Sequence, residues 1–198
     1  KSRREGQDVA SWRREIFSIV DCRNGIICIF AKMFNTLSYF FMDTVKPYVI
    51  GLDLGGTNSV FGIVDARGNI LSTTAIKTQA YPDVNDYVTA GCEALDPIIY
   101  AAGGIEKIQG MGIGAPNANY YTGNIENAAN LAWDGIVPLA KMFSEKLGIP
   151  VAMTNDANAA AMGEMTYGVA KGMKNFIMIT LGTGVGSGIV INGQVVYG

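Results

Sequence analysis

The stretch from Tyr48 to Val64 reads YVIGLDLGGTNSVFGIV, and it decides the fold. Two apolar, β-branched runs, residues 48–54 and 59–64, flank a short turn, which predicts a β-hairpin. The turn contains Gly55, Gly56 and Thr57. Because glycine has no Cβ, main-chain N–H groups in such a turn can approach an anion closely, and the threonine adds a hydroxyl donor. The stretch therefore predicts a phosphate site on a β-turn, although paired glycines are also typical of a plain hairpin turn.

A second glycine-rich turn lies near the end of the sequence, where residues 181–188 read LGTGVGSG. It lies between two apolar runs, so a second hairpin is expected to start near Asn175. Its candidate phosphate ligands are Gly182, Thr183 and Gly184. Neither turn has the pattern of a P-loop, and neither opens a helix in the manner of a dinucleotide-binding fold. The two turns together indicate one phosphate group held from two sides, while a plain flexible turn is the alternative interpretation of the second.

Strand-like and helix-like segments alternate between the two turns. Apolar residues recur at helical spacing from Val84 to Ala102, and Gly103-Gly104 ends that pattern. The expected strands cover residues 48–54, 59–64, 70–76, 108–113 and 149–154, and the expected helices cover residues 84–102, 137–147 and 157–167. This βββαβαβα order is that of the ribonuclease-H-like α/β fold, and the closing hairpin resembles the opening one. We therefore expect a first lobe over residues 46–172 and the start of a second lobe over residues 173–198.

Composition limits the classes of function. The 198 residues are 49% hydrophobic and 16% charged, with a formal net charge of −2, which is typical of a globular chain without an electrostatic footprint for nucleic acid. Cys22, Cys28 and Cys92 have neither zinc-site spacing nor the density of a secreted disulfide scaffold, which favours a reducing cytoplasm. Histidine is absent, so a Ser-His-Asp or Cys-His mechanism within these residues is excluded. Any proton acceptor in this sequence is then a carboxylate.

Residues 1–45 differ from the rest of the sequence. The first 21 residues are charged and without pattern, and the apolar stretch from Gly25 to Phe41 is interrupted by Lys32 and Asn35. A bilayer span needs about 20 mainly apolar residues, so an extension outside the fold is favoured over a membrane anchor or signal peptide. Met42 immediately precedes the first expected strand. We therefore expect natural translation to start at Met42 and to produce a cytoplasmic protein without a membrane partner.

Five segments, in this order and spacing, resemble the ROK family of repressors and sugar kinases, and most of all its bacterial glucokinases. They are DLGGTN at residues 53–58, GIGAP at 112–116, NAANLAW at 127–133, NDANAAA at 155–161 and LGTGVG at 181–186. The resemblance covers residues 46–198. It implies an actin-like ATPase fold, in which two lobes close over ATP, and an ATP-dependent kinase that phosphorylates a hexose hydroxyl.

The resemblance also implies roles for individual residues. Asp156 would be the general base that takes the proton from the attacking sugar hydroxyl, while Asn155, Asn130 and the backbone at Gly114 would hold the sugar. Asp53 would be a carboxylate on the Mg²⁺ side, acting through water, because Mg²⁺ takes few protein ligands. The residues themselves leave other interpretations open. Asp156 is also a suitable N-cap for the following helix, and Asp53 is also a suitable strand-end residue that shapes the turn.

The expected function is ATP-dependent phosphorylation of a hexose, foremost of glucose to glucose 6-phosphate, with ATP and Mg²⁺. Kinases for N-acetylmannosamine, fructose or allose are close alternatives within the family. A sugar-sensing transcriptional regulator of the same family is a further alternative, but no helix-turn-helix pattern precedes the first expected lobe. An actin-like ATPase without a sugar would leave the segments around Asn130 and Asp156 unexplained. We also expect a homodimer at full length and, because the sequence lacks a basic footprint, no nucleic-acid partner.

The resemblance extends to the last residue of the sequence. Family kinases continue from this point into further sugar ligands, a cysteine-rich zinc loop and the adenosine pocket. We therefore expect the 198-residue chain alone to lack kinase activity, and any structural zinc to lie beyond Gly198. Within the matched part, Asn117 stands where many family members have glycine, which leaves the shape of that loop open.

Overall fold

A computed structural model of the chain describes residues 46–181 and 184–197. The expected extension over residues 1–45 lies outside the described residues, as do Gly182 and Thr183 of the second glycine turn. Within the described ranges, no helix is both long enough and apolar enough to cross a membrane.

The first sheet has five strands in the order β3-β2-β1-β4-β8. They are β1 (Tyr48–Leu54), β2 (Ser59–Asp65), β3 (Ile70–Ile76), β4 (Ile108–Ala115) and β8 (Val151–Asn155). The first three form an antiparallel meander, and β4 and β8 run parallel to β1. Tight turns can join antiparallel neighbours, whereas each parallel strand needs a crossover, which the helices supply. The predicted βββαβαβα order of the ribonuclease-H-like sheet is confirmed.

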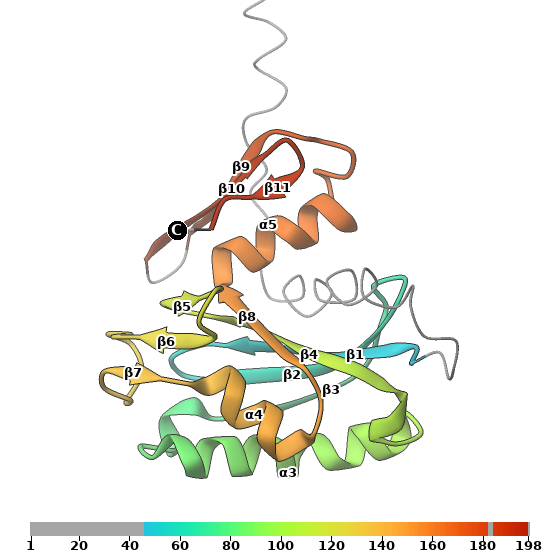
Figure 1. Ribbon diagram of the computed structural model, residues 1–198, viewed down its shortest axis with the longest axis vertical. Helices are drawn as coiled ribbons and strands as arrows, with labels where there is room; N and C mark the ends of the chain where they lie inside the picture. Colours follow the sequence, from blue (N-terminus) through green and yellow to red (C-terminus); the bar gives the residue numbers. More distant parts are fainter. Residues whose placement is uncertain (1–45, 182–183, 198) are drawn as a thin grey trace, which may run out of the picture.

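Two helices cover one face of this sheet (Figure 1). They are α3 (Val84–Ala101) and α4 (Leu139–Leu147), and short 3-10 turns lie before and after α3 at Thr78–Ala80 and Ile105–Lys107. Ile50 and Phe61 of the sheet are fully buried beneath them. Gly91 of α3 permits this contact, because a Cβ there would lie 3.0 Å from the Phe61 ring and 3.3 Å from the Phe143 ring. Each large apolar side chain buried here stabilises the fold by about 1.5–3 kcal/mol, so this face holds the main core.

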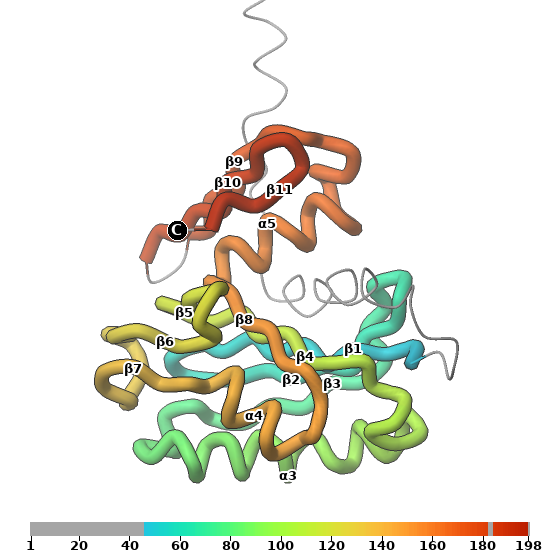
Figure 2. Tube along the Cα trace, viewed as in Figure 1, coloured from blue at the N-terminus to red at the C-terminus, as the bar shows by residue number. Residues whose placement is uncertain are grey.

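The opposite face carries α5 (Asp156–Thr166), through which the chain passes from the first sheet to a second one (Figure 2). The second sheet has the order β11-β10-β9, with β9 (Phe176–Leu181), β10 (Val185–Ile191) and β11 (Gln194–Val195). β10 packs closely on the alanine-rich α5. A Cβ at Gly188 would lie 2.5 Å from the carbonyl oxygen of Ala157 and 2.6 Å from the Cβ of Ala161. The close approach of strand and helix therefore requires glycine at position 188.

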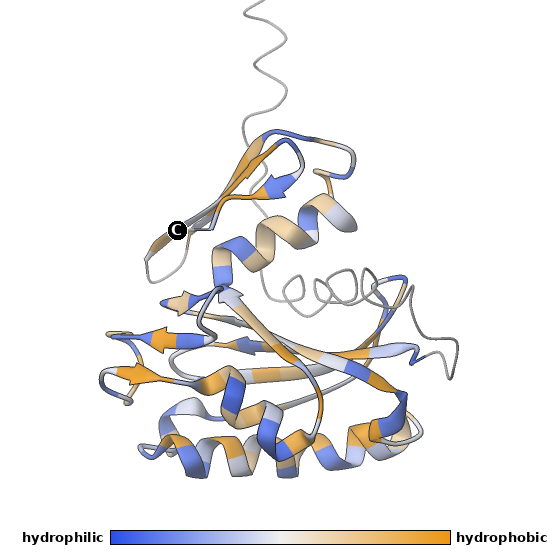
Figure 3. Cartoon of the chain, in the orientation of Figure 1, coloured by the Kyte–Doolittle hydropathy of each residue, from blue (hydrophilic) through white to orange (hydrophobic). Residues whose placement is uncertain are grey.

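Strands β9 and β10 are largely apolar (Figure 3). On the side that faces α5, Met178 and Val190 are buried. On the other side, Ile177, Leu181 and Val185 are exposed. Within the described chain, this hairpin therefore contributes only one of its two faces to a core.

A third, small sheet lies between β4 and α4, where no strand was expected. It consists of β5 (Ala118–Asn119), β6 (Asn124–Glu126) and β7 (Ile136–Val137). Asn117 opens it with a left-handed backbone, at a φ of 52°, and its Nδ2 donates to the carbonyl oxygens of Glu126 and Asn127. Asparagine tolerates this conformation better than other residues with a Cβ. Asn117 therefore provides the backbone geometry for which glycine is otherwise suited.

Three predicted boundaries were wrong by one or two residues. The second predicted helix begins at Leu139 and not at residue 137, because Ile136 and Val137 pair with β6. The last predicted strand of the first sheet begins at Val151, after Pro150, which has no N–H to donate to a sheet. The helix expected from residue 157 already includes Asp156.

Candidate active site

The register of the first sheet places the predicted site residues at one edge. Asp53 of β1 lies opposite Gly114 of β4, Gly114 lies opposite Thr154 of β8, and Ala115 lies opposite Asn155. The carboxyl ends of these three parallel strands therefore meet at the N-terminus of α5, beside the β1–β2 turn (Figure 1). Predicted residues from three separate segments of the sequence come together here.

Asp53 and Asp156 form the electrostatic centre of this edge. The pKa of Asp53 rises from its ordinary value of 3.8 to about 6, first because burial disfavours the charged carboxylate and second because the negative charge of Asp156 is close. No described lysine or arginine forms an ion pair with either carboxylate. Two carboxylates without a counter-charge can bind a cation or accept a proton during a reaction. The described residues contain no group of three or more His, Cys, Asp or Glu side chains arranged as a metal site, and Mg²⁺, which keeps most of its waters, does not need one.

The N-terminus of α5 holds Asp156 in place. Asn155 is the N-cap, and its side-chain oxygen accepts a hydrogen bond of 3.0 Å from the backbone N–H of Ala157. Oδ1 of Asp156 accepts a hydrogen bond of 2.8 Å from the same N–H. The interpretation of Asp156 as the N-cap was therefore wrong, because Asn155 holds that position. Oδ2 of Asp156 and Nδ2 of Asn155 remain without a hydrogen bond to any described residue.

Thr154 is a residue that sequence reasoning missed. Its side chain is buried, and its Oγ1 has no hydrogen-bond partner among the described residues. In register with Gly114 and Asp53, it projects to the same face of the sheet as Asp53. A buried hydroxyl without a partner is uncommon. Its position one residue before the Asn155-Asp156 pair was the available signal.

The first glycine turn presents free backbone donors. The N–H of Gly55 donates to the carbonyl oxygen of Asn58 over 3.0 Å, and this bond closes the turn. The N–H groups of Gly56, Thr57 and Asn58 make no hydrogen bond to any described residue. Successive unpaired N–H groups in a turn form an anion-binding concavity. The turn therefore has the donors that a phosphate group requires.

The backbone of Asn130 lies directly against this turn. A Cβ at Gly56 would lie 2.6 Å from the carbonyl oxygen of Asn130, so only glycine permits the contact. The predicted sugar-binding residue Asn130, which is exposed, therefore adjoins the predicted phosphate turn. The two functions were predicted from separate segments, and the structure brings those segments together.

The second glycine turn is described in part. Gly182 and Thr183 lie outside the described residues, and Gly184 is exposed with open space around it. Gly186 and Gly188, which follow, serve the packing of β10 on α5. The phosphate role of Gly182, Thr183 and Gly184 stays a prediction.

The aromatic residues near the site belong to the fold. Trp133 is buried, and its Nε1 donates to the carbonyl oxygen of Tyr81 over 3.0 Å. Tyr120 is exposed and stacks on Tyr197 with ring centroids 3.9 Å apart. Glu164 of α5 accepts a hydrogen bond from the backbone N–H of Val169, which lies just after the end of the helix, so this side chain also serves the fold.

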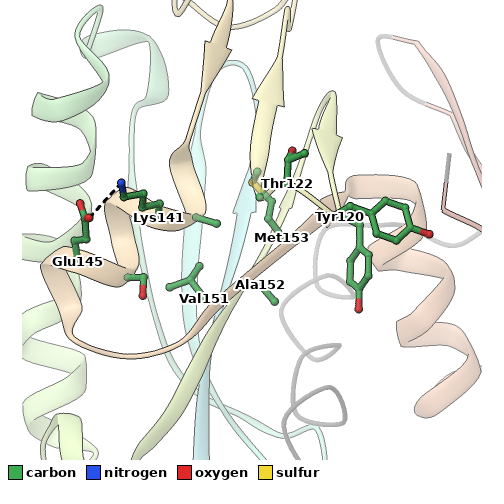
Figure 4. A pocket seen from close by; sticks show the side chains of 11 residues that line it. Tyr120, Thr122, Lys141, Glu145, Val151, Ala152 and Met153 are labelled. Carbon is green, nitrogen blue, oxygen red and sulfur yellow. Dashed lines mark ion pairs between the residues drawn. The ribbon is translucent and has the colours of Figure 1, made fainter.

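A hollow of about 540 Å³ lies elsewhere, along the outer edge of β8 (Figure 4). Its walls come from β8, from α4 and from the turn after β5, and the exposed ion pair between Lys141 and Glu145 lies on the α4 side. It contains none of the predicted site residues. The hollow is therefore separate from the candidate active site.

Several known proteins are similar to this chain. A glucokinase from Streptomyces coelicolor is 40% identical over 146 residues, which are 73% of this chain and 44% of that protein. The crystal structure of a ROK family glucokinase from Streptomyces griseus, in complex with glucose and AMPPNP, is 38% identical with a TM-score of 0.65, over 76% of this chain and 46% of that chain. A ROK family transcriptional regulator, a homologue of the E. coli MLC protein, is 22% identical with a TM-score of 0.65, over 75% of this chain and 38% of that chain, and this likeness shows the fold alone.

The chain spans about half the length of the curated relatives it matches. Its predicted actin-like ATPase fold is confirmed by the solved structures that it resembles. A family model matches residues 49–198, from the first strand to the last residue. The chain therefore belongs to the ROK family.

Proposed function

We propose that the protein from which this chain comes transfers the γ-phosphoryl group of ATP to a hexose hydroxyl, with glucose as the favoured sugar. The observation that carries the proposal is the meeting of Asp53, Asp156 and the β1–β2 turn at the carboxyl ends of three strands. The likeness to glucokinases over residues 49–198 supports the same conclusion.

Asp156 is the proposed general base. Its Oδ1 accepts a hydrogen bond from the Ala157 N–H, which restrains that oxygen and leaves Oδ2 for a substrate hydroxyl. A base positioned in this way contributes about 10²–10⁴ to the rate. The proton of the attacking hydroxyl passes to Oδ2 as the oxygen attacks the γ-phosphorus. The bond from the γ-phosphorus to the β–γ bridging oxygen breaks in the same step, and ADP leaves.

The sugar is proposed to bind between β4, α5 and the loop that carries Asn130. Nδ2 of Asn155 is available as a donor because the cap uses only its oxygen. Asn130 is exposed beside the first glycine turn, and the backbone at Gly114 lies opposite Asp53 in the sheet. These groups present donors and acceptors of the kind that sugar hydroxyls need.

The ATP phosphates are proposed to lie on the N–H groups of Gly56, Thr57 and Asn58, with Gly182, Thr183 and Gly184 approaching from the other hairpin. Mg²⁺ on the phosphates would supply positive charge for the Asp53–Asp156 pair, with Asp53 holding it through water. The proposed lobes are residues 46–172 and the start of a second lobe over residues 173–198. A cytoplasmic homodimer, with any structural zinc beyond Gly198, completes the proposal.

The decisive experiment is ADP release by the protein made from its complete reading frame. Mg-ATP would be supplied with glucose, N-acetylmannosamine, fructose, mannose or allose in turn. Turnover with glucose far above the others supports the proposal, and turnover with another sugar reassigns the substrate. Saturable sugar binding without turnover, in folded protein, would instead favour the sugar-sensing regulator, whose fold the chain shares.

A further inference from the structure

A chain of buried hydroxyl groups lies behind the first glycine turn. Oγ1 of Thr78 donates to the carbonyl oxygen of Gly55 over 2.7 Å. Oγ of Ser59 lies 2.8 Å from Oγ1 of Thr78, and the hydroxyl of Tyr87 donates to Oγ of Ser59 over 2.8 Å. All three side chains are buried, at 3% exposure or less. They come from β2, from the 3-10 turn after β3 and from α3.

The direction of every hydrogen bond in this row of hydroxyl groups is fixed. Tyr87 uses its single proton on Ser59, and Thr78 uses its single proton on Gly55. The proton between Ser59 and Thr78 therefore belongs to Ser59. The result is a one-way series of donors that ends on a single carbonyl oxygen of the turn. Burial from water makes each of these bonds costly to lose.

The end point of the series decides where the turn points its donors. A β-turn is often closed by a bond from its fourth N–H to its first carbonyl, here from Asn58 to Gly55. No such bond is present, and the Gly55 carbonyl accepts a hydrogen bond from the hydroxyl of Thr78. The C=O of Gly55 and the N–H of Gly56 belong to one trans peptide plane and point in opposite directions. Holding the carbonyl toward Thr78 therefore turns the N–H of Gly56 to the opposite side, and the N–H of Asn58 makes no hydrogen bond to a described residue.

The loop that carries Asn130 is anchored separately. Trp133 binds the carbonyl oxygen of Tyr81 through Nε1, and its ring lies 4.6 Å from the Tyr87 ring. These contacts use the ring of Tyr87 and not its hydroxyl. Removing hydroxyl groups from the series therefore leaves the anchor of the loop that carries Asn130 in place.

We propose that Thr78, supported by Ser59 and Tyr87, is a positioning residue that aims the backbone donors of the first turn at the phosphates of ATP. The inference rests on the proposed function in one respect, namely that this turn binds ATP. Thr78 touches no substrate in this scheme and acts only through the peptide group between Gly55 and Gly56.

The test compares Thr78→Val, which keeps the shape and removes the hydroxyl, with Thr78→Ser, which keeps the hydroxyl, in protein from the complete reading frame. Dissociation constants for Mg-ATP and for glucose would be measured by calorimetry. We expect Thr78→Val to weaken Mg-ATP binding about tenfold, equivalent to 1.4 kcal/mol, and to change glucose binding by less than about twofold. Thr78→Ser should restore Mg-ATP binding to within about twofold of the unchanged protein. Tyr87→Phe removes only the hydroxyl at the far end of the series and should weaken Mg-ATP binding about threefold.

Two substitutions serve as controls. Tyr81→Phe removes a neighbouring hydroxyl outside the series, and Thr73→Val repeats the threonine-to-valine change at an exposed position of β3. Neither should alter Mg-ATP binding. If Thr78→Val fails to fold, Tyr87→Phe and Thr78→Ser decide the question.

The outcomes separate this inference from the proposed function. Equal Mg-ATP affinity in Thr78→Val and unchanged protein, or equal losses for ATP and glucose, would overturn the positioning role even in an active kinase. Absence of Mg-ATP binding by folded, unchanged protein would overturn both proposals. Mg-ATP binding without sugar turnover would overturn only the proposed function. The Mg-ATP dissociation constants of the Thr78 and Tyr87 variants would still decide the role of Thr78.

Discussion

Replacing Asp53 by asparagine should stabilise the chain at neutral pH. The folded state raises the pKa of this carboxyl from 3.8 to about 6, first through burial and then through the charge of Asp156. A raised carboxyl pKa means that the folded state holds the proton more tightly than the unfolded state, so stability falls as pH rises from about 4 to about 6. Each factor of ten in the proton dissociation constant corresponds to about 1.4 kcal/mol. The shift of the Asp53 pKa therefore lowers the free energy of unfolding above pH 6 by at most about 3 kcal/mol. Because the side chain is partly exposed, solvent should reduce this to about 1–2 kcal/mol.

Urea unfolding of the unchanged chain and of Asp53→Asn, at pH values from 4 to 8, measures this effect. The two chains should have similar unfolding free energies near pH 4, and the variant should be the more stable above pH 6. Asp65→Asn is the control of opposite sign, because side-chain and backbone hydrogen bonds, the largest from the Asn69 side chain, lower the pKa of Asp65. Its carboxylate contributes stability above about pH 4, so this variant should lose stability there. A difference between Asp53→Asn and the unchanged chain that does not depend on pH would refute the reasoning.

Three further results are expected. In protein from the complete reading frame, Asp156→Ala should lower kcat about 10²–10⁴-fold while the glucose dissociation constant, measured by calorimetry, changes little, and near-normal kcat would remove Asp156 as the base. Gly188→Ala should destabilise the chain by about 1–3 kcal/mol in urea unfolding, because its Cβ would lie 2.5 Å from the Ala157 carbonyl oxygen, whereas Gly184→Ala, with nothing within 4 Å, should not. The 198-residue chain alone should release no ADP with any hexose, and hexose-dependent ADP release by it would contradict the expected need for further sequence.

The long elements of the fold could be predicted because each carries its own apolar pattern. The helix from Val84 to Ala101 shows one buried face to the sheet, and the strands of the meander are bounded by turn residues. The third sheet could not be predicted, because its strands have only two or three residues. Side-chain bonds from Asn117 and a left-handed backbone at Asn127 hold it together, and neither has a periodic signal.

The glycine pattern of the second turn did not reveal the use of each glycine. A glycine that frees donors for a ligand and a glycine that makes room for a neighbouring segment look alike in a sequence. Gly188 belongs to the second kind, since its missing side chain makes room for Ala157 and Ala161. Gly56 belongs to both kinds, because its N–H makes no hydrogen bond to a described residue and its missing Cβ makes room for the backbone of Asn130. Only the neighbours in space, which come from other segments, tell these uses apart.

The strand end at Asn155 and Asp156 shows how a structural role and a chemical role can share one turn. From the sequence, the same aspartate was a candidate for both the helix cap and the base. In the structure, Asn155 supplies the cap, and the shared Ala157 N–H also fixes one oxygen of Asp156. The asparagine thereby satisfies the helix without using the second carboxylate oxygen. Because the cap no longer depends on Asp156, its removal should affect proton transfer far more than helix stability, so measuring kcat and unfolding free energy on the same variant separates the two roles.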